Sequence, residues 1–314
     1  MNESATVLNA VIPIFGIMVI GLLIRKLNWL TEEADQSMLR VTVNLLLPCL
    51  ILDKALGNPA LAHTGNLLAA PLVGFGTTAA GMCIALAVQR WLGLTEQREK
   101  RTFALTVGMY NYGYIPVPLA LLLFDDKTVG VLFVHNVGVE ITLWTLGLML
   151  LTGGGTWDWR KVINAPLAAI VLALTLNGVG ADAHIPEVIR TAVSWLGQCT
   201  IPLALILIGA VIADHLHEFH SASGWRVIST AVVLRIGLLP LLFLLLAKFL
   251  PVTDELKRVI VLQAAMPSAT LPIVMSKLYK GDAPTAVRVV ISTSVVGLVT
   301  IPLWLRFGMK FVGL

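Results

Sequence analysis

The chain of 314 residues alternates long apolar runs with short polar segments from one end to the other. A run of roughly 20 apolar residues can cross a bilayer as a helix. We expect such helices at about residues 7–24, 37–56, 66–91, 102–124, 128–151, 162–179, 186–212, 225–250, 256–279 and 284–307. The pattern predicts an all-α polytopic membrane protein with ten transmembrane helices.

The fourth run is interrupted by prolines, glycines and polar residues. Residues 108–119 read GMYNYGYIPVPL and include Asn111, Pro116 and Pro118. Proline lacks a backbone donor and crowds the preceding turn, and an unpaired backbone group in hydrocarbon costs several kcal/mol. We therefore predict a broken helix whose break faces protein, water or a ligand.

The ninth run contains a second interruption of the same kind. Residues 264–272 read AAMPSATLP, with prolines at Pro267 and Pro272. Two broken helices in matching halves of a chain are typical of secondary transporters, in which the breaks form the ligand site.

Composition agrees with a membrane protein. Hydrophobic residues make up 57% of the chain and charged residues 13%, whereas soluble domains carry about 25% charged residues. The net charge of +4 then reflects the distribution of charges among loops, so we expect no nucleic-acid partner. The first apolar run lacks a basic start and a small-residue cleavage site, so we expect a retained helix.

The two halves of the chain share residues at a nearly constant spacing. The matched pairs are Asn9 with Asn164, Glu33 with Glu187, Pro48 with Pro202, Lys100 with Lys257 and Pro116 with Pro272. Their order predicts a duplicated five-helix unit, with a first repeat at 1–152, a cytoplasmic linker at 153–161 and a second repeat at 162–314. An odd number of helices per unit gives the repeats opposite orientations.

Loop charge predicts the orientation. With both termini outside, the cytoplasmic loops carry more Lys and Arg residues than the outer loops, as the positive-inside rule requires. We therefore expect both termini in the periplasm. The broken helices then run antiparallel, and the amino-terminal ends of their half helices meet near the membrane midplane, where helix dipoles favour a carboxylate.

The motif NYGYI at 111–115, followed by Pro118, resembles the first crossover of the auxin efflux carrier family, the bacterial relatives of plant PIN-type carriers. The segment AMPSA at 265–269 is similar to the second crossover of that family, and residues 164–166 and Pro48 also fit. The resemblance covers the whole chain.

Two positions depart from the family pattern. Pro116 stands where the family often has glycine, and Leu271-Pro272 stands where a second crossover asparagine is common. Direct transfer of ligand specificity from the family therefore does not follow.

The resemblance implies an inverted repeat like that of bile-acid transporters and sodium–proton antiporters. It implies a scaffold of helices one, two, six and seven that forms a homodimer, and a mobile transport unit of helices three to five and eight to ten. It further implies an elevator-like motion that carries a small organic acid, such as a mono- or dicarboxylate, across the inner membrane. Lipids are the other expected partner, and no cofactor is expected.

The breaks and the resemblance together predict the substrate site. We expect the Asn111 amide to donate to a carboxylate while it also caps a half helix. The other predicted substrate residues lie in or beside the two breaks: Tyr112, Gly113, Tyr114, Pro116, Met266, Pro267, Ser268 and Thr270.

Two charged residues lie near the middle of predicted helices. Glu140 is either a packing carboxyl or a proton-titrating group coupled to transport, and Asn136 lies one turn earlier on the same face. Arg235 costs about 2.5 to 3.5 kcal/mol to insert, so it needs a partner: Glu140, carbonyls freed by Pro240, or the substrate carboxylate. His135 is either a packing residue or a proton relay.

Other functions require features that the chain does not have. The cluster DHLHEFH at 214–220 falls in a predicted loop, with no second cluster to complete a metal site. A prenyltransferase needs aspartate-rich loops, and a serine protease needs a Gly-x-Ser-Gly-like setting. The remaining alternative to an organic-anion transporter is a proton- or sodium-coupled cation antiporter, although Glu140 is the only acid in a helix centre.

Overall fold

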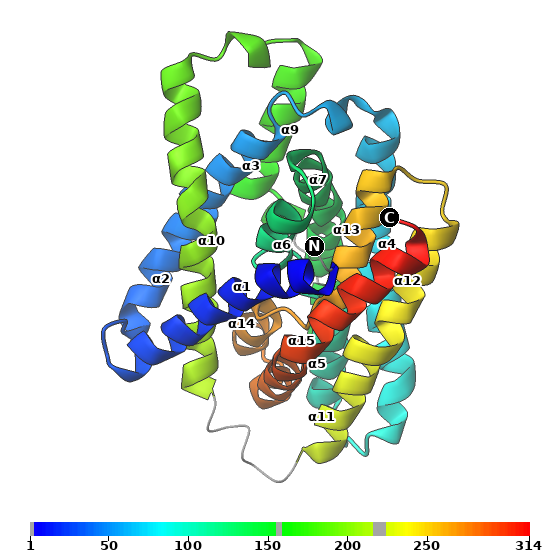
Figure 1. Cartoon of the computed structure of the whole chain (residues 1–314). Coiled ribbons are helices and arrows are strands. Elements are labelled where there is room, and N and C mark those ends of the chain that lie inside the picture. The colour runs from blue at the N-terminus through cyan, green and yellow to red at the C-terminus, as the bar shows by residue number, and fades with distance from the viewer. Residues whose placement is uncertain (1–2, 155–158, 216–223) are drawn as a thin grey trace.

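The computed structural model describes residues 3–154, 159–215 and 224–314, which form helices and loops (Figure 1). Among the residues that the structure describes, six helices are long and apolar enough to cross a membrane: Thr6–Lys26, Thr64–Trp91, Asp126–Thr152, Glu187–Asp214, Trp225–Phe249 and Ala283–Val312. Each overlaps an apolar run identified above. The chain is therefore a multi-pass membrane protein.

One group of helices is built on the long α10 (Glu187–His215), at the left in Figure 1. Helix α1 (Glu3–Lys26) packs on α10, and α3 (Leu47–Ala55) packs on both α10 and α9 (Ala165–Gly178). Helix α2 (Glu32–Val41) precedes α3 in the same long element. These five helices form the first helix group, and they correspond to the first, second, sixth and seventh apolar runs.

The second helix group surrounds α4 (Thr64–Val88) and α7 (Asp126–Thr142), which pack along each other. Its other members are α5 (Gln97–Gly108), α6 (Pro116–Leu123), α8 (Leu148–Thr152), α11 (Trp225–Val232), α12 (Leu239–Phe249), α13 (Asp254–Ala265), α14 (Leu271–Leu278) and α15 (Ala283–Val312). The two groups meet where α1 contacts α6 and α15 and where α3 contacts α7.

Glycines allow close helix contacts in both groups. A Cβ atom at Gly209 would lie 1.9 Å from the Met18 carbonyl oxygen, between α10 and α1. A Cβ atom at Gly138 would lie 1.8 Å from the Pro71 carbonyl oxygen, between α7 and α4. Small residues at such positions let helix backbones approach in membranes.

The two proline-containing stretches separate pairs of helices. Helix α5 ends at Gly108 and α6 begins at Pro116, so we define the first break as residues 109–115. Helix α13 ends at Ala265 and α14 begins at Leu271, so the second break is residues 266–270. Pro116 and Pro272 occupy the first turn of the second half helix, where the missing N–H costs nothing. The prolines therefore start helices here rather than interrupt a continuing turn.

Long elements also contain π-helical turns, which the apolar pattern did not predict. The turns are η1 (Thr42–Leu46) between α2 and α3, η4 (Leu143–Gly147) between α7 and α8, and η8 (Val233–Leu238) between α11 and α12. Such turns are frequent at functional sites. Here η4 contains Trp144, and η8 contains Arg235.

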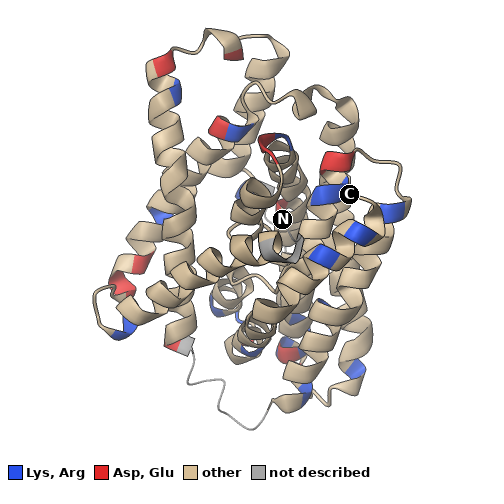
Figure 2. Cartoon of the chain, viewed as in Figure 1, with Lys and Arg blue, Asp and Glu red and all other residues tan. Residues whose placement is uncertain are grey.

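Most charged residues lie toward the ends and outer edges of the bundle (Figure 2). At one end Lys54 pairs with Asp126, and Arg258 pairs with Asp125. At the other end the N–H of Asp282 donates to Thr102 Oγ1 at 2.9 Å. Loops gathered at two opposite ends are expected of helices that cross a membrane in alternating directions. Which end faces the periplasm stays a prediction.

Candidate functional site

The two breaks lie against each other. The Asn111 N–H donates to the Pro267 carbonyl at 2.8 Å, and the Ala269 N–H donates to the Met109 carbonyl at 2.9 Å. Between these bonds, Tyr110 and Ser268 form an isolated antiparallel β-bridge. The interrupted helices thus satisfy some of their freed backbone groups with each other, as buried peptide groups must.

Helix α7 holds the first break through Tyr112. Asn136 Nδ2 donates to the Tyr112 carbonyl at 2.8 Å, and the Tyr112 hydroxyl donates to Glu140 Oε1. Trp144 Nε1 donates to Glu140 Oε2 at 2.9 Å. Asn136, Glu140 and Trp144 follow one another at four-residue intervals, which places them on one helix face. One face of the helix therefore holds both the backbone carbonyl and the side-chain hydroxyl of Tyr112.

Arg235 holds the second break from η8. Its Nε donates to the Met266 carbonyl at 3.1 Å, and its Nη2 donates to the Gln263 carbonyl at 3.4 Å. The guanidinium carbon also lies 5.2 Å from the centroid of the Tyr110 ring, which belongs to the first break. Because the side chain is 0% exposed, a positive charge is buried where the two breaks meet.

Gln263 and Thr293 add contacts around the junction. Gln263 Nε2 donates to the Tyr112 carbonyl at 3.2 Å, so α13 also holds the first break. The Ser268 N–H donates to Thr293 Oγ1 of α15 at 3.2 Å. Neither Gln263 nor Thr293 was among the predicted site residues.

The structure shows one of the two properties expected of Asn111, a hydrogen bond at the start of the half helix α6. Asn111 Oδ1 accepts from the N–H of Ile115, the residue before α6, at 3.3 Å. Its Nδ2 has no hydrogen-bond partner among the residues that the structure describes. Contact with a ligand stays a prediction.

The other predicted substrate residues lie at the same junction. The carbonyls of Met266 and Pro267 are already paired with Arg235 and Asn111. The Ser268 side chain is buried, with an exposed fraction of 1%. The remaining residues lie in the breaks or in the first turn of α6: Tyr112, Gly113, Tyr114, Pro116 and Thr270.

Of the three alternatives for the partner of Arg235, pairing with Glu140 is wrong. Glu140 accepts from two neutral donors of its own neighbourhood, and Arg235 donates to backbone carbonyls of the second break. The carbonyls freed by Pro240 are not the acceptors either. The physical reason is position: Glu140 reaches the junction from α7 and contacts the first break, whereas Arg235 reaches it from η8.

His135 has two partners in the interior. Its Nε2 lies 3.5 Å from the Tyr110 hydroxyl, and its Nδ1 lies 3.3 Å from Asn136 Oδ1. The side chain is 1% exposed. These contacts fit either interpretation, so the role of His135 stays a prediction.

Metal binding has no support in the described residues, where no group of three His, Cys, Asp or Glu side chains could hold an ion. Most of the cluster at 214–220, and part of the linker at 153–161, lie outside the described residues.

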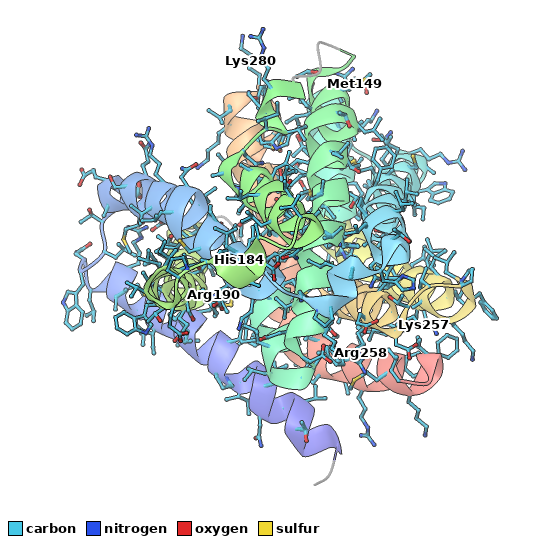
Figure 3. All side chains as sticks on the ribbon, turned by 90° about the horizontal axis from the view of Figure 1, so that it is seen from above. Met149, His184, Arg190, Lys257, Arg258 and Lys280 are labelled. Atoms are coloured by element: carbon cyan, nitrogen blue, oxygen red, sulfur yellow. The ribbon has the colours of Figure 1, made fainter. Side chains whose placement is uncertain are left out.

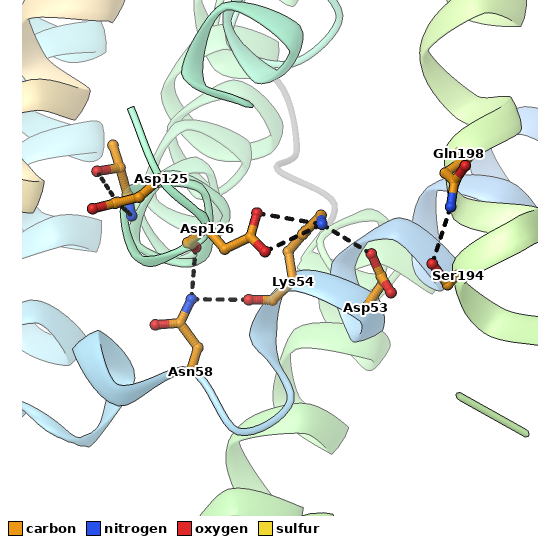
Figure 4. Close-up of polar contacts among 8 residues, drawn as sticks. Asp53, Lys54, Asn58, Asp125, Asp126, Ser194 and Gln198 are labelled. Atoms are coloured by element: carbon orange, nitrogen blue, oxygen red, sulfur yellow. Dashed lines mark hydrogen bonds and ion pairs between the residues drawn. The ribbon is translucent and has the colours of Figure 1, made fainter. Parts of the chain in front are cut away.

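A separate polar network joins α3 to the start of α7 (Figure 4). Lys54 Nζ lies 3.3 Å from an Asp126 carboxylate oxygen, and Asn58 Nδ2 donates to the Asp126 carbonyl at 2.7 Å. Asp125 Oδ1 accepts from the Thr128 N–H at 2.9 Å and caps α7. This network fixes the end of the helix that carries Glu140.

A cavity of about 420 Å³ lies at the same end, between α3, α9 and α10. Its lining is mostly apolar and includes Leu56 and Leu176. His184 and Arg190, which lie close together in Figure 3, also line it. The cavity belongs to the first helix group, and none of the predicted substrate residues lines it.

Three residues of the junction were missed in the sequence. Trp144 lies four residues after Glu140, so helical spacing could have placed it beside the carboxyl. The sequence shows Gln263 as a polar residue in an apolar run, but it does not show that this residue contacts the first break. Thr293 gave no signal, because threonine is common in membrane helices and its contact depends on tertiary packing.

A bundle of apolar helices with two interrupted helices joined at their breaks defines a polytopic membrane transport protein. The sequence model of the family described as "Membrane transport protein" matches residues 6–158 and 154–305. The chain belongs to this family, the auxin efflux carrier family that its motifs resemble.

Similar proteins include two archaeal ones. The chain is 26% identical over 310 residues to an uncharacterized transporter of Methanothermobacter thermautotrophicus, and the alignment covers 97% of this chain and 98% of the relative. It is 19% identical over 303 residues to an uncharacterized transporter of Methanocaldococcus jannaschii, covering 95% and 97% of the two chains. The protein is therefore a membrane transporter and not an enzyme.

Proposed function

We propose that this transporter moves a small organic carboxylate across the inner membrane and binds it between the two breaks. The observation that carries the proposal is the direct contact of the breaks, from which α6 and α14 both begin. The amino-terminal end of a helix favours an anion through its dipole and its unpaired N–H groups. The unpaired Nδ2 of Asn111 offers a further donor.

The proposed mechanism is an elevator-like motion of the second helix group against the first. Both breaks belong to the second group, which corresponds to the expected transport unit. The first group corresponds to the expected scaffold, through which we propose homodimer formation. Ten crossings, an inverted repeat and periplasmic termini complete the proposal. The repeat is supported by the family match, which falls into two segments that overlap at 154–158. The proposed orientation rests on the distribution of Lys and Arg among the loops.

The proposal is tested with purified protein in liposomes. Charge movement and uptake are measured for a panel of mono- and dicarboxylates, with and without a proton gradient. A carboxylate current that needs no gradient indicates uniport driven by the membrane potential. If no carboxylate moves and cations instead produce pH changes, the protein is a cation antiporter and the proposal fails.

Asn111→Ala tests the binding position. We expect carboxylate affinity to fall by about 1 to 3 kcal/mol, the cost of removing a buried hydrogen-bond donor from an anion. Asn44→Ala is the matched control, because Asn44 is exposed and bonds to the Arg40 carbonyl of its own helix. Equal affinity in Asn111→Ala and the wild type contradicts the assignment.

Glu140→Gln tests proton coupling. If transport requires the gradient, and the variant loses that requirement, Glu140 titrates during transport. If the variant keeps the wild-type dependence on the gradient, Glu140 serves only to position Tyr112.

A further inference from the structure

The guanidinium of Arg235 lies at the carboxyl-terminal end of a half helix. Its two acceptors, the carbonyls of Gln263 and Met266, belong to the end of α13 and the residue after it. Carbonyls at this end of a helix carry the negative end of its dipole, and the Gln263 carbonyl also accepts from the Met266 N–H at 3.3 Å. Arg235 is thus well placed to stabilise the end of α13, but these carbonyls carry no net charge.

The positive charge of Arg235 has no acidic partner in the part of the chain that the structure describes. The ion pairs there join other residues, and Glu140 bonds to Tyr112 and Trp144. The rings of Tyr110 and Phe243, at 5.2 and 5.3 Å from the guanidinium carbon, are its other neighbours. A buried charge without a counter-charge costs several kcal/mol, so an anion that reached it would be strongly favoured.

Three buried side-chain atoms at the junction lack hydrogen bonds among the described residues: Arg235 Nη1, Ser268 Oγ and Gln263 Oε1. The first two can donate a hydrogen bond, whereas the amide oxygen of Gln263 can only accept one. Arg235 and Ser268 both adjoin Tyr110, since Arg235 lies over its ring and Ser268 is its partner in the β-bridge. A guanidinium and a hydroxyl can each donate to one oxygen of a carboxylate. A carboxylate would therefore satisfy both unpaired donors and the uncompensated charge together.

We propose that Arg235 and the Ser268 hydroxyl hold the carboxylate of the substrate, and that the site prefers monocarboxylates. This inference rests on the proposed transport of organic anions. One fixed positive charge balances one carboxylate. A dicarboxylate brings a second negative charge, for which the described residues offer no buried cation at the junction, and Glu140 lies nearby through Tyr112.

Equilibrium binding to the purified full-length protein tests this assignment. The probes are benzoate and hexanoate, their uncharged analogues benzamide and hexanamide, and the dicarboxylates succinate and adipate. We expect the wild type to prefer each monocarboxylate over its amide by about 100-fold, as a charged hydrogen bond implies, and to bind the dicarboxylates more weakly. Arg235→Gln should bring carboxylate and amide to similar affinity, whereas Arg235→Lys should keep most of the preference.

Arg226→Gln is the matched control, because Arg226 is exposed on the adjoining helix α11. A folded Arg235→Gln variant that still prefers the carboxylate overturns the inference. If Arg235→Gln does not fold, Ser268→Ala decides: the preference must fall by about tenfold, and an unchanged ratio overturns the inference. A wild type that binds none of the anions refutes the proposed function itself, whereas binding that ignores Arg235 and Ser268 refutes only their role.

Discussion

The two breaks come from the same sequence pattern but are held by opposite chemistry. The first is held from α7 by an amide and a carboxyl, Asn136 and Glu140, and the second is held from η8 by Arg235. When the two halves are aligned at the spacing of their matched residues, the position that corresponds to Arg235 lies near Gly81 of α4. A Cβ atom at Gly81 would lie 3.0 Å from Gly108 Cα, so close backbone packing replaces the arginine there.

The comparison shows that the repeated pattern specifies where the half helices end, whereas each half has its own side chains that hold the break. Prolines and small residues start and stop the half helices in both halves, so the breaks form at matching places. The side chains that fix those breaks differ in charge, which makes the junction asymmetric. An asymmetric junction suits a ligand with one charged end better than a symmetric one does.

The largest effect is expected where the first break relies on backbone packing. A Cβ atom at Gly108 would lie 2.5 Å from the backbone nitrogen of Met82, so Gly108→Ala must push α5 away from α4. We expect a loss of about 3 kcal/mol, at the upper end for overpacking, measured as a lower Tm in detergent. Gly297→Ala, beside Pro267 of the second break, is the control, because its Cβ would meet nothing closer than 3.6 Å. Equal Tm values for the two variants would show that backbone packing at the first break contributes no more to stability than packing at the second break.

The carboxyl contact of the first break should have the next largest effect. Tyr112→Phe leaves Glu140 Oε1 without its phenol donor, which should cost about 1 to 3 kcal/mol. A double-mutant cycle with Glu140→Gln isolates the pair, and we expect a coupling energy of about 1 kcal/mol or more. The cycle is measured by thermal unfolding, and additive losses mean that the bond does not stabilise the first break.

Thr293 offers the corresponding test in the second break. Thr293→Val keeps the shape of the side chain but leaves the Ser268 N–H without its acceptor, at an expected cost of about 1 to 2 kcal/mol. Thr300→Val is the control in the same helix, because Thr300 bonds only to the Val296 carbonyl of that helix. A Tm loss in Thr293→Val no larger than in the control would indicate that water or a ligand pairs with Ser268 instead.

The breaks could be predicted from the sequence because their signal is local. Proline has one preferred place in a helix, and two prolines with glycines in an apolar run leave few alternatives. Asn111 could be selected for the same reason, as a polar residue inside the break. The apolar runs likewise predicted where the helices lie, with limits close to those in the structure.

The partners of Arg235 and Glu140 could not be predicted in the same way. A helix that is hydrophobic on all sides has no polar face that would show how it is oriented in the bundle. The sequence therefore does not show toward which neighbour a single polar residue points. The π-turns η4 and η8 change the helix phase beside both residues, and the apolar pattern does not show them. Pairing of Glu140 with Arg235 was therefore one alternative suggested by charge alone, and the tertiary arrangement gives the two residues different partners.

The smallest effect concerns the start of α7, whose face holds the first break. Burial raises the pKa of Asp125, but the hydrogen bonds from Thr128 and the positive charge of Arg258 outweigh it and leave the pKa below its usual value. The ionised carboxylate therefore stabilises the folded state above its ordinary pKa, and this contribution is lost as the pH falls through the lowered value.

Asp125→Asn should lower stability by a few tenths of a kcal/mol near neutral pH, because its ion pair with Arg258 is partly exposed to solvent. The difference in Tm from the wild type should be constant from about pH 6 to 8 and shrink below about pH 4, where the wild-type carboxylate takes up its proton. Arg258→Gln should produce a similar loss, and the double variant should lose little more than either single one. If the difference persists undiminished at low pH, the carboxylate acts as a neutral helix cap, and its charge does not contribute to holding α7 in place.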